Sequence, residues 1–346
     1  MKLTKTILTT FFSVALFIGC GDPIAKKVDE INNNNNSNYE ENSTNSDNSN
    51  SQTLAKTLYP TKIKKSGQTL SYDADGNLVT DGSIKDDGFY QAGEARDFSL
   101  NSNVVTDSVS GIDWEDTPHS SSTEVSYSKA KEYCSKLNLD SKDNWRVPTL
   151  KEFTQLINYA KRGPALDSEF KYAKYGLDSV GYWSSTKSTF RWWISLLTGN
   201  DHFYITDNNK HYVKCVNNIN SNWKEANFTR EDGIVKDNNS KLFWQDNTTI
   251  SNKSWIEAIN YCESLNLGGY SNWRLPNINE LGSIIDHNSN SNLDKIFKQS
   301  TSDLYWSSTS HAAQTSIAWV INFKYGSNAY KTKDSKLSTR CVREKN

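Results

Sequence analysis

The sequence predicts an α+β fold that is built twice in tandem, and three observations lead to this prediction. The two halves of the chain share a series of motifs in the same order. Each of the two repeated segments, 97–217 and 226–346, also holds two cysteines at matching positions. In each half, segments with helix-start signals are interspersed with short segments rich in aromatic and β-branched residues. We therefore expect two copies of one disulfide-stapled domain, each with two helices and short antiparallel strands.

The N-terminal end has the layout of a secretory signal peptide at residues 1–19. Basic residues precede a largely apolar run at 7–18, which is too short to span a bilayer comfortably and is followed by Gly-Cys. The end of this run resembles a bacterial lipobox, which implies lipidation of Cys20, although Phe17 stands where leucine is usual. By the same resemblance, Gly21 implies sorting to the outer membrane, on its periplasmic or external face. An ordinary secretory signal with an incidental cysteine is the alternative.

Residues 20–53 are expected to form a disordered tether that begins at the lipidated cysteine. From 31 to 53 the chain is almost wholly polar and is dominated by Asn and Ser. Such a segment buries too little apolar surface to offset the entropy of ordering. The expected partner of this end of the chain is the membrane, reached through the lipid anchor.

The two copies are recognised by motifs that recur with nearly constant spacing. The first copy is placed at 97–217 and the second at 226–346, behind a leader segment at 54–96 that is expected to pack on the first copy. The recurring motifs are YCSKLNL and YCESLNL around Cys134 and Cys262, NWRVPTLKEF and NWRLPNINEL at 144–153 and 272–281, and YWSST at 182–186 and 305–309.

The cysteines predict one disulfide in each copy. Four cysteines remain apart from Cys20, and an exported location permits disulfides. Free or metal-bound thiols are the alternative, but the sequence has neither CxxC pairs nor histidines that match between the copies, which argues against zinc. The predicted pairs are Cys134–Cys215 and Cys262–Cys341.

The helix starts are predicted from capping signals. In the second copy a turn at 237–241 separates two strands of a hairpin, and a helix then begins after Ser254, which forms a capping box with Glu257. The second helix begins after Thr149 in the first copy and after Asn277 in the second, again with a glutamate three residues later.

Each copy is expected to end in two strands. Residues 192–197 and 318–323 are rich in aromatic and branched residues and predict one strand in each copy. A final strand carries the second cysteine. The disulfide then joins the first helix to the last strand and brings the ends of the copy together.

Several of these motifs occur together in one known family. NWRxP with its following glutamate, YWSST, the aromatic strand and the terminal cysteine jointly resemble the Lcl C-terminal domain family, over both copies. The resemblance implies a C-type-lectin-like fold related to that of the formylglycine-generating enzyme. The family takes its name from a collagen-like adhesin that binds sulfated polysaccharides. It therefore implies an adhesin or lectin-like protein, although one fold hosts many activities.

Arginines and tryptophans in the shared motifs are the candidates for ligand binding. An arginine fork suits a carboxylate or sulfate, and a tryptophan beside serine hydroxyls suits a sugar ring. The structural alternative is that the arginines pair with internal carboxylates or stack on a tryptophan, and that the tryptophans lie in the core. Adjacent strand residues face opposite sides, so one of two neighbouring tryptophans is expected to be exposed or in a second contact surface. The candidates are Arg146, Trp183, Trp192 and Trp193 in the first copy and Arg274, Trp306 and Trp319 in the second.

The residue pattern favours a binding protein over an enzyme. The five histidines have no counterparts between the copies, and motifs such as GxSxG or HExxH do not occur. The calcium-binding segments of lectins with the implied fold are missing, since Trp145 is followed by Arg146. We therefore expect no metal and no cofactor. The net charge of −1 gives no support for a nucleic-acid partner.

The resulting hypothesis is a non-catalytic lipoprotein of the bacterial cell envelope that binds a glycan or an envelope protein. One alternative is a structural or assembly lipoprotein with protein partners only. Another is an oxidoreductase related to the formylglycine-generating enzyme, which would need free thiols at Cys134 and Cys215.

Overall fold

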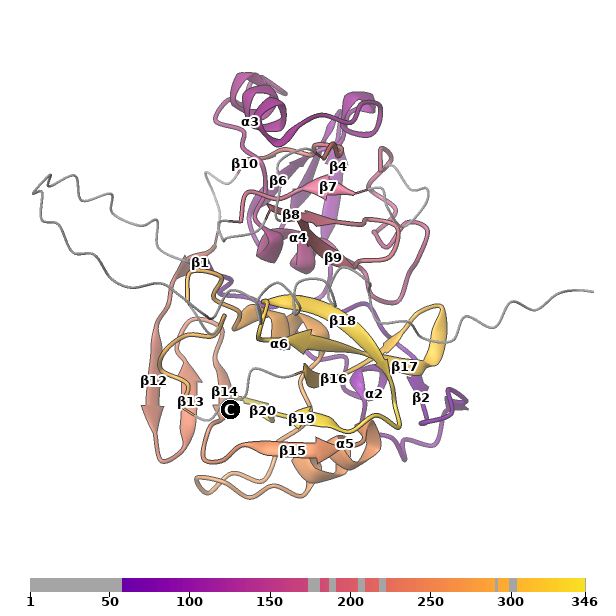
Figure 1. The fold of residues 1–346 in the computed structure, drawn as a ribbon, viewed down its shortest axis with the longest axis vertical. Coiled ribbons are helices and arrows are strands. Elements are labelled where there is room, and N and C mark those ends of the chain that lie inside the picture. The colour runs from indigo at the N-terminus through magenta and orange to yellow at the C-terminus, as the bar shows by residue number, and fades with distance from the viewer. Residues whose placement is uncertain are drawn as a thin grey trace, which may run out of the picture. The chain divides into compact units, whose positions relative to one another are not determined.

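The structure, a computed structural model, places residues 55–346 in one compact unit (Figure 1). The expected signal peptide, Cys20 and the tether lie outside the residues that it describes. Within the described part of the chain, no helix combines the length and the apolar character that a membrane crossing needs. The described residues are 58–173, 181–186, 191–204, 209–217, 222–289, 292–298 and 304–345.

The described part of the first copy contains two antiparallel sheets. One sheet has the strand order β10-β6-β5-β4 and the other has the order β7-β8-β9. Two α-helices and a short 3-10 helix, η1, lie between them in the sequence. The elements are β4 Phe98–Asn101, β5 Val104–Asp107, β6 Ile112–Glu115, η1 Pro118–Ser121, α3 Tyr127–Lys136, α4 Leu150–Leu156, β7 Tyr182–Trp183, β8 Arg191–Ile194, β9 Asp201–Tyr204 and β10 Val216–Asn217.

The second copy repeats this arrangement with longer strands. Its four-stranded sheet, β12-β13-β14-β20, corresponds to β4-β5-β6-β10. Its other sheet has the order β15-β19-β16-β17-β18, in which β16 and β19 pair in parallel. The elements are β12 Phe228–Glu231, β13 Ile234–Asp237, β14 Leu242–Gln245, β15 Ile250–Lys253, α5 Trp255–Glu263, α6 Ile278–Ser283, β16 Leu304–His311, β17 Gln314–Asn322, β18 Ser327–Thr332, β19 Leu337–Thr339 and β20 Val342–Glu344.

Both predicted disulfides are present. Cys134 in α3 is bonded to Cys215, and Cys262 in α5 is bonded to Cys341. Each second cysteine lies one residue before the final strand, so the predicted helix-to-strand connection is correct to within one residue. The final strand pairs with β6 or β14, the third strand of its copy. The final strand of each copy therefore joins the same sheet as the first strand, at the opposite edge.

The predicted helix starts are confirmed. The Ser254 hydroxyl accepts the N–H of Glu257, and the Glu257 carboxylate accepts the N–H of Ser254. Thr149 and Asn277 cap α4 and α6 in the same reciprocal manner. The predicted turn at 237–241 connects β13 to β14. These features depend on residues close in sequence, which is why the local patterns predict them.

The two aromatic strands differ from their predicted bounds. Residues 318–322 of the segment predicted at 318–323 lie in β17, which begins earlier, at Gln314. The segment predicted at 192–197 ends early, because β8 stops at Ile194. The chain then turns through Gly199, whose φ is +85° and where an added Cβ would lie 2.7 Å from Ile157 Cγ2. A tight turn that requires glycine replaces the end of the predicted strand.

The leader segment contacts both copies. Its Lys64 ammonium forms a buried ion pair with Asp107 of the first copy. In the second copy, Thr309 Oγ1 donates to Asp87 Oδ2 at 2.6 Å. Its first strand pairs antiparallel with β11, which lies in the linker between the copies. The elements involved are β1 Leu58–Tyr59, β2 Ser71–Tyr72, β3 Leu78–Val79, α2 Asp87–Tyr90 and β11 Lys224–Glu225.

The two copies share one apolar core cluster, and each copy also has a smaller cluster of its own. Helix α4 of the first copy packs against α6 of the second (Figure 1). Buried side chains from both copies form one continuous cluster that includes Phe153 of α4 and Leu281 of α6. The Gln155 side chain donates through Nε2 to the backbone oxygen of Asn279 at 3.1 Å. The copies are therefore not independent domains on a flexible linker.

A reciprocal hydrogen-bonded pair, Asp201 on β9 and Asn328 on β18, also joins the copies. The N–H of Asn328 donates to Asp201 Oδ2 at 2.9 Å, and the N–H of Asp201 donates to Asn328 Oδ1 at 3.1 Å. Asp201 Oδ1 is buried and has no hydrogen-bond partner among the described residues. Burial raises the pKa of Asp201 from 3.8 to about 8.

We expect this carboxyl group to make the free energy of unfolding fall as the pH rises from about 4 to about 8. In that range the folded protein retains a proton that the unfolded chain has released, which costs up to about 1.4 kcal/mol per pH unit. Asp201→Asn removes the ionisable group and with it this pH-dependent loss of stability. Its amide nitrogen has no partner, which offsets part of the gain. The variant should therefore be more stable than the parent by about 2 kcal/mol at pH 8, with no gain at pH 4.

Urea denaturation at pH 4, 6 and 8 measures this slope. Asp75→Asn, at an exposed turn of the leader, is the matched control and should keep the parental pH dependence. An Asp201→Asn protein with the same pH slope as the parent would contradict the prediction.

Candidate functional site

The arginine of the NWRxP motif forms the same ion pair in both copies. Arg274 donates through Nη1 and Nη2 to the two carboxylate oxygens of Glu280, at 2.7 and 2.6 Å. Arg146 pairs with Glu152 in the same bidentate geometry. Each glutamate also completes the capping box of its helix. These arginines therefore orient a helix, which is the structural alternative to ligand binding.

The YWSST motif also has a structural role in both copies. Trp183 and Trp306 are buried, and their Nε1 groups donate to the backbone oxygens of Val125 and Lys253 at 2.7 and 2.9 Å. These oxygens lie just before the first helix of each copy. The last threonine of the motif accepts, through its hydroxyl, the first N–H of the second helix. These bonds join Leu150 to Thr186 at 2.7 Å and Ile278 to Thr309 at 3.0 Å.

Trp192 and Trp193 are both buried, so neither is exposed, and of the two expected alternatives the second contact surface applies, to Trp192. They lie on β8, the middle strand of its sheet, and both faces of this strand are covered. The Trp192 ring lies 5.4 Å from the ring of His287 in the second copy, so it belongs to the contact between the copies. The Trp193 ring stacks between His202 at 4.2 Å and His211 at 4.6 Å.

Trp319 of the second copy is buried at the same contact between the copies. Its ring lies 5.0 Å from the ring of Tyr159 in the first copy. The five candidate tryptophans are all 3% exposed or less, so none of them offers a ring face to a sugar from solvent. The five tryptophans thus pack in the interior and the two arginines orient helices, and the structure does not arrange the seven candidates into one binding site.

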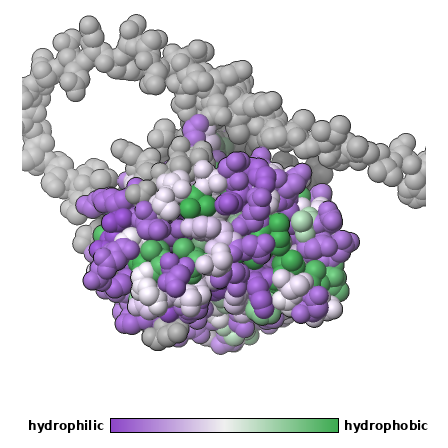
Figure 2. All heavy atoms as spheres, turned by 90° about the horizontal axis from the view of Figure 1, so that it is seen from below, coloured by the Kyte–Doolittle hydropathy of each residue, from purple (hydrophilic) through white to green (hydrophobic). Residues whose placement is uncertain are grey.

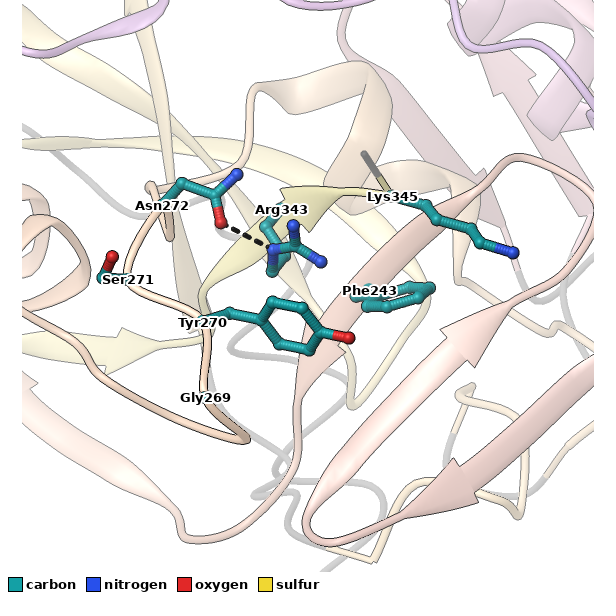
Figure 3. Close-up of a pocket in the computed structure, with 7 residues that line it drawn as sticks. All are labelled: Phe243, Gly269, Tyr270, Ser271, Asn272, Arg343 and Lys345. Atoms are coloured by element: carbon teal, nitrogen blue, oxygen red, sulfur yellow. Dashed lines mark hydrogen bonds between the residues drawn. The ribbon is translucent and has the colours of Figure 1, made fainter.

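An open pocket lies instead on the second copy, beside the four-stranded sheet (Figure 3). Its volume of about 390 Å³ is at the small end of the range for ligand sites. Strands β14 and β20 supply one wall, and the loop that follows α5 supplies the other. Gly269 in this loop has a φ of +78°, which glycine adopts without strain. The other lining residues are Phe243, Tyr270, Ser271, Asn272, Arg343 and Lys345.

Arg343 is the central polar group of this pocket. Its guanidinium carbon lies 3.9 Å from the ring centroid of Tyr270 and 5.3 Å from that of Phe243. Its Nε donates to Asn272 Oδ1 at 2.8 Å, as the dashed line in Figure 3 shows. The side chain is only 2% exposed. Two aromatic rings and one amide therefore hold the guanidinium in a fixed orientation.

The charge of Arg343 is not neutralised by a carboxylate. Among the described residues no ion pair reaches it, and its Nη1 and Nη2 atoms have no hydrogen-bond acceptor. Burial lowers the pKa of this guanidinium, although arginine stays charged at neutral pH. Arg274 in the same copy is also buried from solvent but is fully paired with Glu280. A buried cation with two unused donors is the strongest indication of a ligand site in the described chain.

The matched positions of the first copy hold a different arrangement. Asp113 pairs with Asn217 across the sheet as Phe243 pairs with Arg343, which makes these positions equivalent. Lys142 stands where the second copy has Tyr270, and its Nζ forms an ion pair with Asp113 Oδ2 at 2.6 Å. An internal ion pair therefore replaces the aromatic rings and the unpaired guanidinium.

The chemistry of the pocket suits binding. Its lining supplies a positive guanidinium, an ammonium, hydroxyl and amide groups, and aromatic surface, and it includes no Cys, His, Asp or Glu. Elsewhere in the described part of the chain, no group of three or more such side chains is placed to hold a metal ion. The lining thus offers recognition groups without a carboxylate, imidazole or thiol to act as acid, base or nucleophile.

The shared motifs do not mark the pocket, because the residues that line it are not shared between the copies. Phe243, Tyr270 and Arg343 differ from the residues at the matched positions of the first copy. The sequence signal that would have found them is this difference between otherwise similar copies. It is a stronger guide to the site than the repeated motifs, which serve the fold.

Comparison with known proteins gives one result for each copy. A family model described as the Lcl C-terminal domain matches residues 103–217 and again residues 233–343. A search among curated proteins found no match.

Proposed function

Since the chain belongs to the Lcl C-terminal domain family, with two tandem copies of that domain, we propose that it is a non-catalytic glycan-binding lipoprotein of the bacterial cell envelope. A lipid on Cys20 anchors it, in this proposal, to the outer membrane, and residues 20–53 serve as the tether. The observation that carries the proposal is the open pocket around the unpaired guanidinium of Arg343.

The composition of the pocket supports a glycan more than a protein partner. Tyr270 stands beside Ser271 and Asn272, whose side chains are exposed, and Lys345 extends the polar rim. An aromatic ring beside hydroxyl and amide groups matches the alternating apolar and polar surface of a sugar. A protein interface typically presents a larger apolar centre.

The disulfides support an exported protein and a binding role. Disulfides persist in oxidising compartments outside the cytoplasm. All four cysteines of the two copies are paired, so they supply no free thiol for chemistry of the formylglycine-generating type. We further propose that each copy has a C-type-lectin-like fold. The disulfide that joins the first helix to the residue before the last strand in each copy is consistent with that fold.

One observation favours the alternative, an assembly lipoprotein with protein partners. The leader exposes large apolar side chains, Leu70, Leu78 and Phe89, at 50, 55 and 42%. Such residues suit a protein contact when they form a broad patch. On the face shown in Figure 2, however, hydrophilic residues predominate and hydrophobic residues form small separate groups.

A glycan array tests the proposal directly. The full chain in mild detergent is applied at physiological salt, with and without a chelator, to neutral, sulfated and carboxylated glycans. We expect binding to a subset of glycans that the chelator leaves unchanged, because the pocket contacts a ligand without a metal. The reduced and unfolded chain is the control and should not bind. A blank array with folded, disulfide-bonded protein would overturn the proposal in favour of the assembly role.

A further inference from the structure

We propose that only the second copy binds the glycan, and that Arg343 does so by pairing with a carboxylate on an acidic sugar. This inference rests on the proposed function and specifies the ligand class of the same pocket. It follows from the unpaired charge of Arg343, from the two guanidinium nitrogens that remain free to donate, and from the difference between the copies.

The unsatisfied charge of Arg343 calls for an anion. A buried charge without a partner is costly, and proteins pair such charges or bind an ion with them. Arg274 shows the usual solution within the same copy, a bidentate pair with Glu280. Arg343 instead aims its unused donors at a cavity that solvent can reach. A bound anion would complete the pairing that the chain leaves open.

The free edge of the guanidinium favours a carboxylate. Nε is already occupied by Asn272, so only the two Nη atoms remain to bind a ligand. Two coplanar donors match the two coplanar oxygens of a carboxylate. A carboxylate also brings one negative charge for one buried positive charge.

The surroundings of the guanidinium favour a sugar as the carrier of this carboxylate. Ser271 has a hydroxyl and Asn272 an amide NH₂ group that no described residue engages, and both are exposed at the rim. They are placed to bind ring hydroxyls next to the charged group. Tyr270 and Phe243, whose rings meet at 69°, supply the apolar surface. A cavity of about 390 Å³ has room for a compact ring.

The first copy lacks this site because its own residues satisfy one another. The Lys142 ammonium is paired with Asp113, so the one cation at this place already has its anion. Asn217 stands at the position of Arg343, and its Nδ2 donates to the backbone oxygen of Asp143. A carboxylate there would meet Asp113 and no free fork. The duplicated domain has therefore specialised, with binding in the second copy.

The test compares acidic glycans with their uncharged counterparts. The full chain in mild detergent is titrated with short glycans that carry hexuronic or sialic acids, with their methyl esters, and with sulfated neutral glycans. We expect at least one acidic glycan to bind and its ester to bind at least tenfold more weakly. Affinity should also fall as the salt concentration rises. Equal binding of acid and ester, or preferential binding of sulfated neutral glycans, would overturn the inference.

Variants locate the site. R343Q should weaken binding of the acidic glycan at least tenfold, and R343K should retain part of it, since lysine keeps the charge but not the fork. The triple variant Phe243→Asp, Tyr270→Lys and Arg343→Asn installs the first copy's ion pair and should also abolish binding. This variant serves as the second test if R343Q folds poorly, because its three new residues are those that the first copy holds at the matched positions. Lys142→Gln in the first copy is the matched control and should bind like the parent.

The outcomes separate this inference from the proposed function. Binding of neutral or sulfated glycans that R343Q leaves unchanged would overturn the inference and leave the glycan-binding function standing. Loss of binding in Lys142→Gln but not in R343Q would place the site in the first copy and also overturn it. A folded chain that binds no glycan would overturn both.

Discussion

Replacing Cys262 and Cys341 together with alanine is expected to lower the free energy of unfolding by about 4–5 kcal/mol. The disulfide joins residues separated by 79 positions, and it restricts the unfolded chain by closing that long loop. Both cysteines are fully buried, and the side chain of Cys262 packs in the core cluster around Trp255 and Trp306. Denaturation in guanidinium chloride, followed by tryptophan fluorescence, measures the loss.

The first copy provides the matched comparison for this disulfide. Cys134 and Cys215 are separated by 81 positions, so their replacement by alanine should cost nearly the same. Because the copies also share a core cluster, loss of either disulfide should lower the stability of the whole compact unit rather than of one copy. A loss below about 1 kcal/mol in both variants would contradict the loop-closure argument.

Glu280→Gln is expected to destabilise the protein by about 3 kcal/mol or more. The substitution leaves the guanidinium of Arg274 buried without its carboxylate, and an uncompensated buried charge is among the largest single-residue penalties. It also weakens the capping box of α6, where Glu280 accepts the N–H of Asn277 at 2.9 Å. Glu344, the other acidic neighbour of Arg274, is 60% exposed and compensates little.

Glu152→Gln in the first copy is the control that isolates burial. The Arg146–Glu152 pair has the same geometry, but the Arg146 side chain is 35% exposed, against 8% for Arg274. Water can solvate the exposed guanidinium, so the loss should be about 1 kcal/mol. Thermal and urea denaturation of both variants at pH 7 give the comparison. Equal losses in the two copies would show that burial does not set the cost.

The framework of each copy could be predicted because its determinants are local or duplicated. A capping box needs only the cap and the residue three positions later, as Thr149 and Glu152 illustrate. The disulfide pairs followed from cysteines at matching places in two copies of one domain. Both kinds of pattern are written in the sequence without reference to the packing of distant segments.

The burial of Trp192 could not be predicted from one copy. Alternation along a strand says that neighbouring side chains face opposite sides, but it does not say what covers each side. The second copy covers one face of β8, and Trp192 meets His287 there. Contacts between copies depend on residues distant in sequence, such as Asp201 and Asn328, and no repeated motif marks them.

The pocket was missed for a related reason. Phe243 and Arg343 are far apart in the sequence and become neighbours through the register of β14 and β20. Repetition drew attention to Arg274 and Trp306, which are shared because both copies need them to fold. The residues that distinguish the second copy carry the site, and only a comparison of matched positions reveals them.

The pairing of β1 with β11 determines where a mechanical load enters the molecule. Tension transmitted through the residues that precede Leu58 acts first on this short pair of strands in the linker. Tyr59 of β1 reinforces this joint between the leader and the copies. Its ring lies 5.2 Å from the ring of Phe228 in the second copy, and the ammonium of Lys151 in the first copy lies 3.8 Å from its ring centroid. A pull on Leu58 would therefore have to break this joint before it could draw the rest of the leader away from the two copies.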